Sequence, residues 1–155
     1  MNISLQQMSA PDYQSFLAIA IPDFAKNKAL TGDWKSDEAL EKSKNAFKSL
    51  LPEGLETKDH YLKNILLDGE KTGFVWFAIE EEYGLKYAFL YEIYIFPENR
   101  NKGYGRKAMQ LFMDEVHQSG AEKVYLHVFG HNHGALKLYQ TLGFQINDYT
   151  MSYKI

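Results

Sequence analysis

Between residues 85 and 129 the hydrophobic residues change their spacing twice, which limits the chain to few topologies. Leu85–Phe96 is rich in aromatic and aliphatic residues and is typical of a strand. From Arg106 onward apolar residues recur at helical spacing, and Gly120 stands where a C-cap glycine belongs. Val124–Phe129 then predicts a buried strand. A strand–helix–strand crossover connects parallel strands, so we expect one parallel pair in the sheet.

The residues before this crossover predict antiparallel hairpins. Tyr61–Leu67 and Thr72–Glu80 flank Asp68-Gly69, a dipeptide typical of a tight hairpin turn. Tyr83-Gly84 then leads into the strand that begins at Leu85. We therefore expect three consecutive antiparallel strands.

The remaining elements complete a mixed α/β (α+β) fold, a mostly antiparallel sheet flanked by helices, in one domain over residues 1–155. They are a strand near Asn2–Met8, a helix over Asp12–Ala20, a helix capped by Ser36, a helix from the cap Asn132 to Gly143, and a strand from Phe144 onward.

Composition excludes several classes of function. The 155 residues are 45% hydrophobic and carry a net charge of −3, so the chain lacks the basic field that nucleic-acid binding needs. The absence of cysteine excludes disulfides, thiolate metal sites and cysteine nucleophiles. No segment has the ~20 apolar residues of a membrane span, and the N-terminus lacks a signal-peptide pattern. We expect a cytoplasmic protein without nucleic-acid or membrane partners.

The segment Asn99–Arg106, between a strand and a helix, carries the most chemical information. Gly103 and Gly105 let the backbone approach a ligand without an intervening Cβ, and the helix start offers unpaired N–H groups. Four cations add local positive charge: Arg100, Lys102, Arg106 and Lys107. Such a loop suits a pyrophosphate.

Other interpretations of this loop compete, and an ordinary solvated basic loop is the simplest. Gly103-x-Gly105-x-x-Ala108 also satisfies the dinucleotide fingerprint, which needs its glycines directly after a strand and an acidic residue at the end of the next one. Here Pro97–Lys102 intervene, and Glu122 lies at the wrong end of the next strand. A Walker-type loop fails because no Gly-Lys-Ser/Thr follows.

Two blocks of this sequence resemble the GNAT superfamily of acetyltransferases. The family's acetyl-CoA loop, Gln/Arg-x-x-Gly-x-Gly/Ala, is matched by Arg100, Gly103 and Gly105. The family's second block, Asn-x-x-Ala-x-x-x-Tyr-x-x-x-Gly-Phe, is matched by Asn132, Ala135, Tyr139, Gly143 and Phe144. The resemblance covers the C-terminal half in detail and the N-terminal half only in element order.

The resemblance implies the GNAT acyl-CoA N-acyltransferase fold, whose sheet splays between the strand ending at Phe96 and the strand ending at Phe129. The pantetheine arm of acetyl-CoA would lie in the split and pair with backbone groups of Ile93 and Ile95, where a main-chain N–H could also hold the thioester oxygen. The cofactor-binding residues implied are Ile93, Tyr94, Ile95, Arg100, Asn101, Lys102, Gly103, Tyr104, Gly105, Arg106, Asn132 and Tyr139.

Two side chains are candidates for the chemistry. Similar enzymes use the tyrosine at the position of Tyr139 to protonate, or hydrogen-bond, the departing thiolate of coenzyme A; the alternative is core packing, since Tyr139 lies on an apolar stripe. Many similar enzymes carry a glutamate at the position of Glu92 that takes the amine's proton directly or through water. Its alternative is an exposed carboxylate on the polar side of the strand. Tyr91 and Tyr94 are weaker candidates.

Asn132 and three histidines have structural alternatives to a role in binding. The Asn132 side chain can cap a helix and also touch the cofactor. His127, His131 and His133 form His-x₃-His-x-His, but no carboxylate or cysteine stands at matching spacing, so we expect no metal.

Two further groups bear on the acceptor. Glu80–Glu82 is expected to be a solvated hairpin end, with attraction of a cationic acceptor as the alternative. Tyr13, Phe24 and Trp34 either pack in the core or line an acceptor pocket.

The function that these features predict is transfer of the acetyl group of acetyl-CoA to a primary amine of a small molecule or peptide, by direct attack. One alternative is a non-catalytic acyl-CoA-binding or sensor module on the same fold, and another is a nucleotide-binding protein. The identity of the acceptor stays open. A homodimer is possible, since dimers are common in similar proteins.

Overall fold

The computed structural model describes all residues, Met1–Ile155, and is built on a five-stranded sheet in the order β1-β2-β3-β4-β5. The strands are β1 (Ile3–Gln7), β2 (His60–Leu67), β3 (Glu70–Glu82), β4 (Leu85–Ile95) and β5 (Lys123–Leu126). β4 pairs in parallel with β5, and each other neighbouring pair is antiparallel. The predicted mixed sheet and its parallel crossover are therefore confirmed.

Both predicted hairpin turns are present. Asp68 and Gly69 have φ values of 50° and 85°, and Tyr83 and Gly84 have 52° and 79°. Two consecutive residues with positive φ form the type of turn whose twist matches that of the flanking strands.

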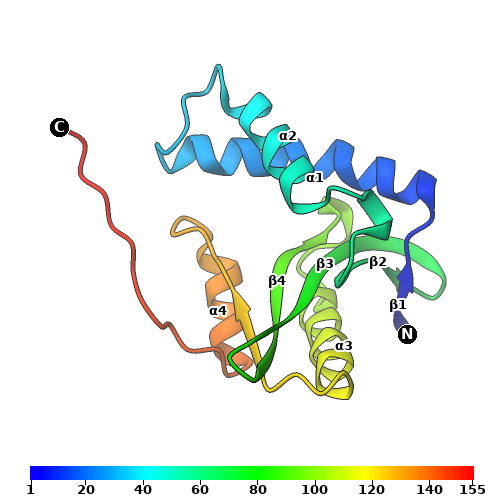
Figure 1. Ribbon diagram of the computed structural model, residues 1–155. Coiled ribbons are helices and arrows are strands. Elements are labelled where there is room, and N and C mark those ends of the chain that lie inside the picture. Colours follow the sequence, from blue (N-terminus) through cyan, green and yellow to red (C-terminus); the bar gives the residue numbers. More distant parts are fainter.

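The helices cover both faces of the sheet (Figure 1). They are α1 (Ala10–Leu30), α2 (Ala39–Leu50), α3 (Tyr104–Gln118) and α4 (His133–Thr141). α1 and α2 pack on one face through a cluster that includes Phe16, Phe47 and Trp76. α3 and α4 pack on the opposite face through a cluster that includes Phe77 and Phe112. None of the helices combines the length and apolar character needed to cross a membrane.

α1 is longer than the helix predicted over Asp12–Ala20. Ser9 caps it in a capping box with Asp12, and the helix continues through Pro22 to Leu30. A proline inside a helix costs about 3 kcal/mol. Packing beyond it opposes this cost, since Ala25 is buried and the ring of Phe24 contacts the rings of Trp34, Phe47 and Phe129.

Three other predicted boundaries are wrong. α2 begins at Ala39 after Glu38, without a side-chain cap, so Ser36 does not cap it. β5 ends at Leu126 rather than Phe129, because its pairing with β4 stops there. The chain from Phe144 onward forms no strand: residues 145–155 are exposed and lie against no strand of their own chain.

A β-bulge in β4 decides which face its later side chains occupy. Trp76 and Phe77 are consecutive on β3, but their partners on β4, Glu92 and Leu90, are separated by one residue. That residue, Tyr91, has no partner on β3 and is the extra residue of the bulge. Tyr91 and Glu92 therefore both lie on the α1/α2 side, whereas Ile93 packs toward α3 and α4. The bulge places two consecutive side chains on one face, which strict alternation would forbid.

Candidate active site

The sheet splays between β4 and β5. Their pairing covers only Tyr87–Leu90 and Lys123–Leu126, whereas β4 continues to Ile95. The split exposes part of the β4 backbone to a ligand.

The register shows which β4 backbone groups face the split. The N–H of Phe96 donates to Thr72 O at 2.8 Å, toward β3. Because hydrogen bonding alternates along an antiparallel strand, the N–H and C=O groups of Ile95 and Ile93 point the other way. The carbonyl of Ile95 accepts from Arg100 Nε at 2.7 Å, in agreement with this direction. The backbone groups predicted to meet the pantetheine arm thus point into the split.

The start of α3 lies beside the split. Gly103 precedes the helix with φ of 83°, and no side chain caps the helix start. The N–H of Lys107 donates to Gly103 O, the first hydrogen bond of the helix. The N–H groups of Tyr104, Gly105 and Arg106 therefore lie ahead of the first helical hydrogen bond. A Cβ on Gly105 would lie 3.9 Å from Ile95 Cγ1, so this turn packs directly against the end of β4.

The cations of the loop are held around this helix start. Arg100 lies over the ring of Tyr94, 4.9 Å from its centroid. Lys102 Nζ donates to Glu98 O at 3.2 Å, and Arg106 Nη2 donates to Thr141 Oγ1 at 2.7 Å. Positive charge and free N–H groups thus coincide, the combination that binds phosphate groups.

The remaining predicted cofactor residues divide by role. Asn101 is exposed in the loop with φ of 61°. Tyr104 is buried and its hydroxyl points to Met1 Sδ at 3.7 Å, so only its backbone serves the loop. Asn132 caps α4 by accepting from the N–H of Ala135 at 3.2 Å.

Glu92 is partly buried rather than the exposed carboxylate of the alternative interpretation. Burial, with a contribution from the charge of Asp23, raises the pKa of Glu92 from 4.5 to about 8. At neutral pH most molecules therefore carry the neutral acid, and the remaining carboxylate is a base matched to that pH.

Asp23 joins the site from α1 and was not among the sequence candidates. Burial raises the pKa of Asp23, with Arg100 and Lys26 acting in the opposite direction. Asn27 Nδ2 donates to Asp23 O at 2.9 Å, and Asn27 Oδ1 lies 2.7 Å from His131 Nε2. These contacts link α1 to the loop after β5. The sequence carried no signal for Asp23, because it lies beyond Pro22, outside the predicted helix.

Tyr139 lies on α4 with 9% of its surface exposed, and its ring centroid is 5.9 Å from that of Phe144. Burial, with a contribution from the charge of Glu92, raises the pKa of Tyr139 to about 12. The phenol is therefore a hydrogen-bond donor and a weak acid, and it also packs in the core as the alternative interpretation expected.

A stack of rings beside Glu92 was also missed from the sequence. Trp76 Nε1 donates to His60 Nδ1 at 2.9 Å, and Tyr91 stacks on Trp76 with ring centroids 4.5 Å apart. Burial lowers the pKa of His60, so this imidazole stays neutral at pH 7 with its proton on Nε2. The bulge places the ring of Tyr91 on the same side of the sheet as Trp76 and His60.

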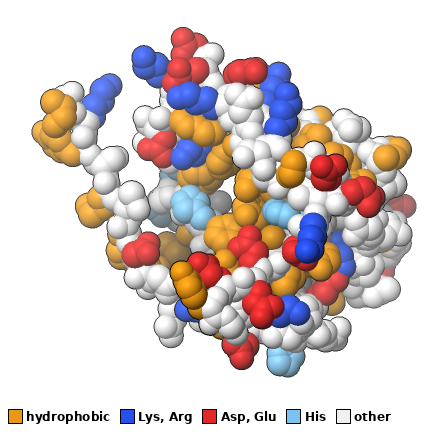
Figure 2. Space-filling view, in the orientation of Figure 1, with side chains coloured by type: hydrophobic (Ala, Val, Ile, Leu, Met, Phe, Trp, Pro, Cys, Tyr) orange, Lys and Arg blue, Asp and Glu red, His pale blue; other side chains and the backbone are white.

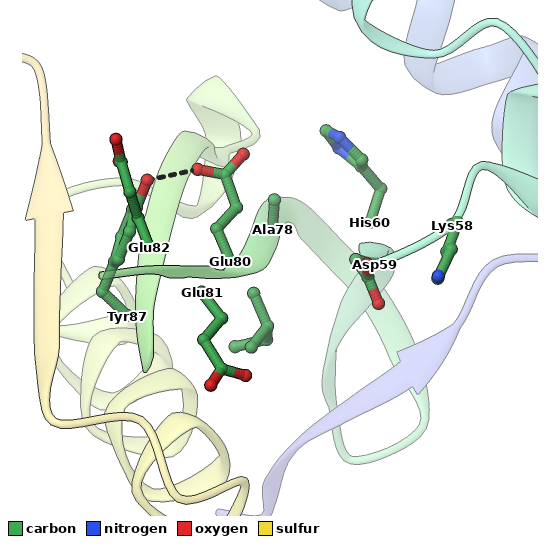
Figure 3. Close-up of a pocket in the computed structure, with 9 residues that line it drawn as sticks. Lys58, Asp59, His60, Ala78, Glu80, Glu81, Glu82 and Tyr87 are labelled. Atoms are coloured by element: carbon green, nitrogen blue, oxygen red, sulfur yellow. Dashed lines mark hydrogen bonds between the residues drawn. The ribbon is translucent and has the colours of Figure 1, made fainter. Parts of the chain in front are cut away.

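An acidic groove of about 410 Å³ adjoins this stack at the end of the β3–β4 hairpin (Figure 3). Its charged and aromatic lining residues are Lys58, Asp59, His60, Glu80, Glu81, Glu82 and Tyr87. Tyr87 donates its hydroxyl hydrogen to Glu80 Oε2 at 2.7 Å. Glu80–Glu82 is exposed, as predicted for a solvated hairpin end, yet it also forms one wall of the groove. In Figure 2, acidic and histidine side chains lie among hydrophobic ones near the centre of this face.

The other aromatic and histidine candidates have structural contacts. Tyr13 stacks on Phe16, with ring centroids 6.0 Å apart, in the α1/α2 cluster. His127 packs edge-on against Phe129 at 5.0 Å. No three His, Asp or Glu side chains of the structure group as possible metal ligands.

A splayed mixed sheet, a basic glycine loop at the start of α3 and a tyrosine on α4 define a class of acyl-transfer proteins. The chain belongs to the acetyltransferase (GNAT) family, whose model matches residues 23–144.

Two relatives come from Bacillus subtilis (strain 168). The uncharacterized N-acetyltransferase YdgE is 33% identical over 152 residues, 97% of each chain. The uncharacterized N-acetyltransferase YycN is 35% identical over 156 residues, the full length of both. The crystal structure of the putative acetyltransferase YycN has a TM-score of 0.95 over 99% of each chain, so the likeness extends through the C-terminal segment.

Proposed function

We propose that this protein transfers the acetyl group of acetyl-CoA to a primary amine of a small molecule or peptide, by direct attack. The observation that carries the proposal is a partly buried carboxyl, Glu92, within electrostatic range of a buried phenol, Tyr139, beside the split in the sheet. A carboxyl with a pKa near 8 in such a place suits proton transfer.

The split and the adjoining helix start fit acetyl-CoA. The N–H groups of Tyr104, Gly105 and Arg106 would receive the pyrophosphate, since a helix start favours anions. Gly103 has no Cβ, and one built there would meet nothing within 4 Å, so the side of the helix start next to this glycine is open to a ligand. The pantetheine amides would pair with the groups of Ile93 and Ile95 that face the split.

Glu92 would supply the base that amine attack requires. An alkylammonium with a pKa near 10.4 is only about 0.04% neutral at pH 7. The ionised carboxylate of Glu92 accepts one amine proton, and the nitrogen lone pair then forms the C–N bond at the thioester carbon. The C–S bond breaks and its electron pair leaves on the sulfur. No covalent enzyme intermediate is needed.

Tyr139 would assist the leaving thiolate by donating a hydrogen bond. A phenol with a pKa of about 12 is a weaker acid than a thiol near 8.5, so complete proton transfer is uphill by about 5 kcal/mol. The hydrogen bond instead stabilises charge that develops on sulfur, and the second amine proton neutralises the thiolate through solvent.

The acceptor would approach along the acidic groove. Its carboxylates favour a cationic molecule, and the groove adjoins the stacked rings of His60 and Tyr91, next to Glu92. This arrangement points to an acceptor with positive charge in addition to the amine that reacts.

The test combines binding with turnover. Acetyl-CoA at one hundred times its dissociation constant should stabilise the fold by about 2.7 kcal/mol in a thermal-shift titration, and coenzyme A nearly as much. Equal or greater stabilisation by NAD would reject the cofactor assignment. A panel of amines with a free-thiol readout then tests catalysis, since tight acetyl-CoA binding without turnover would indicate a non-catalytic acyl-CoA-binding module.

A further inference from the structure

His60 stands at the start of β2 with a ring that the proposed reaction does not use. Its partner across the β2–β3 pair is Ala78, whose side chain ends at Cβ, so the imidazole reaches diagonally to Trp76, two residues away on β3. Trp76 Nε1 donates to His60 Nδ1 at 2.9 Å, and Trp76 is only 3% exposed. The contact therefore fastens the imidazole to the core.

The hydrogen bond from Trp76 decides which nitrogen of His60 carries the proton. An indole N–H can only donate, so Nδ1 is the unprotonated nitrogen and the proton of the neutral ring is on Nε2. Burial lowers the pKa of His60, against the charges of Glu80 and Asp59. Because Nδ1 is occupied, the ring cannot take up a proton without breaking the contact with Trp76. His60 is therefore a hydrogen-bond donor and a poor base.

The Nε2–H lies where an acceptor would approach Glu92. The His60 ring stacks on that of Tyr91, with centroids 5.5 Å apart and 30° between the planes, and Tyr91 precedes Glu92 in the bulge of β4. His60 also lines the acidic groove, and in Figure 3 its ring points to the same side as Glu80, whereas Lys58 points away from it. His60 thus adds a neutral donor to a groove whose other polar groups are mostly carboxylates.

A neutral donor in an anionic groove selects a particular kind of molecule. Carboxylates bind ammonium groups, which donate hydrogen bonds but cannot accept them, so a plain diamine leaves the Nε2–H of His60 without a partner. An acceptor that also carries a hydroxyl or carbonyl oxygen satisfies both the carboxylates and this N–H. A site built to bond a substrate group discriminates against the analogue that lacks it, because its own polar group then stays unpaired.

We propose that His60 is a specificity-determining residue of the acceptor site, whose Nε2–H, oriented by Trp76, donates to an oxygen of the acceptor. The inference rests on the proposed acetyl transfer and names its acceptor class. That class is cationic amines that also carry a hydroxyl or carbonyl oxygen, such as amino alcohols and the amides of basic amino acids.

Two matched variants separate the donor from the ring. His60→Gln keeps an N–H group near the position of Nε2, and His60→Phe keeps the stack on Tyr91 without a donor. Each protein is assayed with two pairs of acceptors that differ by the oxygen-bearing group: diaminopropane with diaminopropanol, and cadaverine with lysinamide. The kcat/KM ratio within a pair is compared between proteins, because intrinsic differences in amine reactivity then cancel.

We expect wild type and His60→Gln to favour the oxygen-bearing member of at least one pair at least about fivefold more than His60→Phe does. Equal ratios in wild type and His60→Phe for both pairs would overturn the inference. So would a loss of kcat/KM for diaminopropane in both variants as large as that in Glu92→Gln, since His60 would then be a base. No turnover of any amine by wild type would instead reject the acetyl transfer itself, and the inference with it.

Nitrogen NMR of the imidazole tests its orientation without relying on activity, with circular dichroism as the check of folding. The wild-type His60 signals, assigned by their absence in His60→Phe, should report a protonated Nε2 and an unprotonated Nδ1. Trp76→Phe removes the donor to Nδ1 and should give a mixture of the two tautomers. A wild-type ring protonated on Nδ1, or the same fixed tautomer in Trp76→Phe, would contradict the orientation by Trp76.

Discussion

Replacing Glu92 with Gln should abolish a pH-dependent loss of stability that the buried carboxyl causes. The pKa of Glu92 is 4.5 in its ordinary state and about 8 in the folded chain, chiefly because burial disfavours the charge. The folded state therefore holds the proton more tightly than the unfolded state. Any stability that the neutral acid provides is complete below about pH 4.5 and decreases as the pH rises toward 8.

The size of the effect follows from this shift. Between the two pKa values the folded chain carries nearly one more proton at this site, so the free energy of unfolding falls by up to about 1.4 kcal/mol per pH unit. Gln has nearly the same volume and cannot ionise. The free energy of unfolding of the variant, relative to that of wild type, should therefore increase steadily with pH. Between about pH 4.5 and pH 8 this increase should reach roughly 3–5 kcal/mol.

Urea unfolding of both proteins at intervals between about pH 5 and about pH 8 measures this difference, with exposed Glu82→Gln as the control that should show no such trend. A stability difference that does not change with pH would mean that Glu92 ionises like a surface carboxyl, and the argument for a buried base would fail. Activity supplies a second readout. In wild type kcat/KM should level off near pH 8, whereas in the Gln variant it should continue to rise toward the amine pKa near 10.

Three further substitutions separate the roles of the site. Tyr139→Phe keeps the ring and its packing, so kcat should fall at least about tenfold with acetyl-CoA affinity and fold retained, and a wild-type kcat would leave Tyr139 with packing alone. Gly105→Val should weaken acetyl-CoA binding at least about tenfold by calorimetry, because a branched side chain crowds the N–H groups at the helix start, while the protein stays folded, because a Cβ there makes only ordinary contacts with Leu138 and Ile95, at 3.7 and 3.9 Å; unchanged affinity would contradict the pyrophosphate site. Glu80→Gln should raise KM more for a diamine than for a monoamine without changing KM for acetyl-CoA, and equal changes for both acceptors would count against the acidic groove.

Most of the sheet could be predicted because its determinants are local. Asp68-Gly69 and Tyr83-Gly84 specify tight turns through residues that accept positive φ, and the glycine at Gly120 marks the end of α3. The helix through Pro22 could not be predicted, since it depends on the packing of Phe24 against Trp34 and other distant rings. The C-terminal strand prediction failed for a related reason: a strand forms only when it pairs with another strand, and the chain after Phe144 pairs with none in the structure.

The candidate site divides in the same way. The positions of Gly103 and Tyr139 follow from spacing within the two blocks that resemble the GNAT family. The burial of Glu92 and the approach of Asp23 depend on the bulge and on the extra length of α1, and neither has a sequence pattern. The identity of the site residues could be predicted from the sequence, whereas the burial and the neighbouring charges that shift their pKa values are seen only in the folded structure.

The unpaired residue at Tyr91 also affects how the length of β4 can change during evolution. In a central strand the loss of one residue normally moves every later side chain to the opposite face. Deleting Tyr91 is different, because it removes the residue without a partner on β3 and leaves Glu92 opposite Trp76, with Ile93 still toward α3. A descendant could shorten this strand by one codon at that position, keep its carboxyl and both cores, and lose only the ring that stacks on His60. Acceptor preference could then diverge by a deletion, while the cofactor side of the molecule stays as it is.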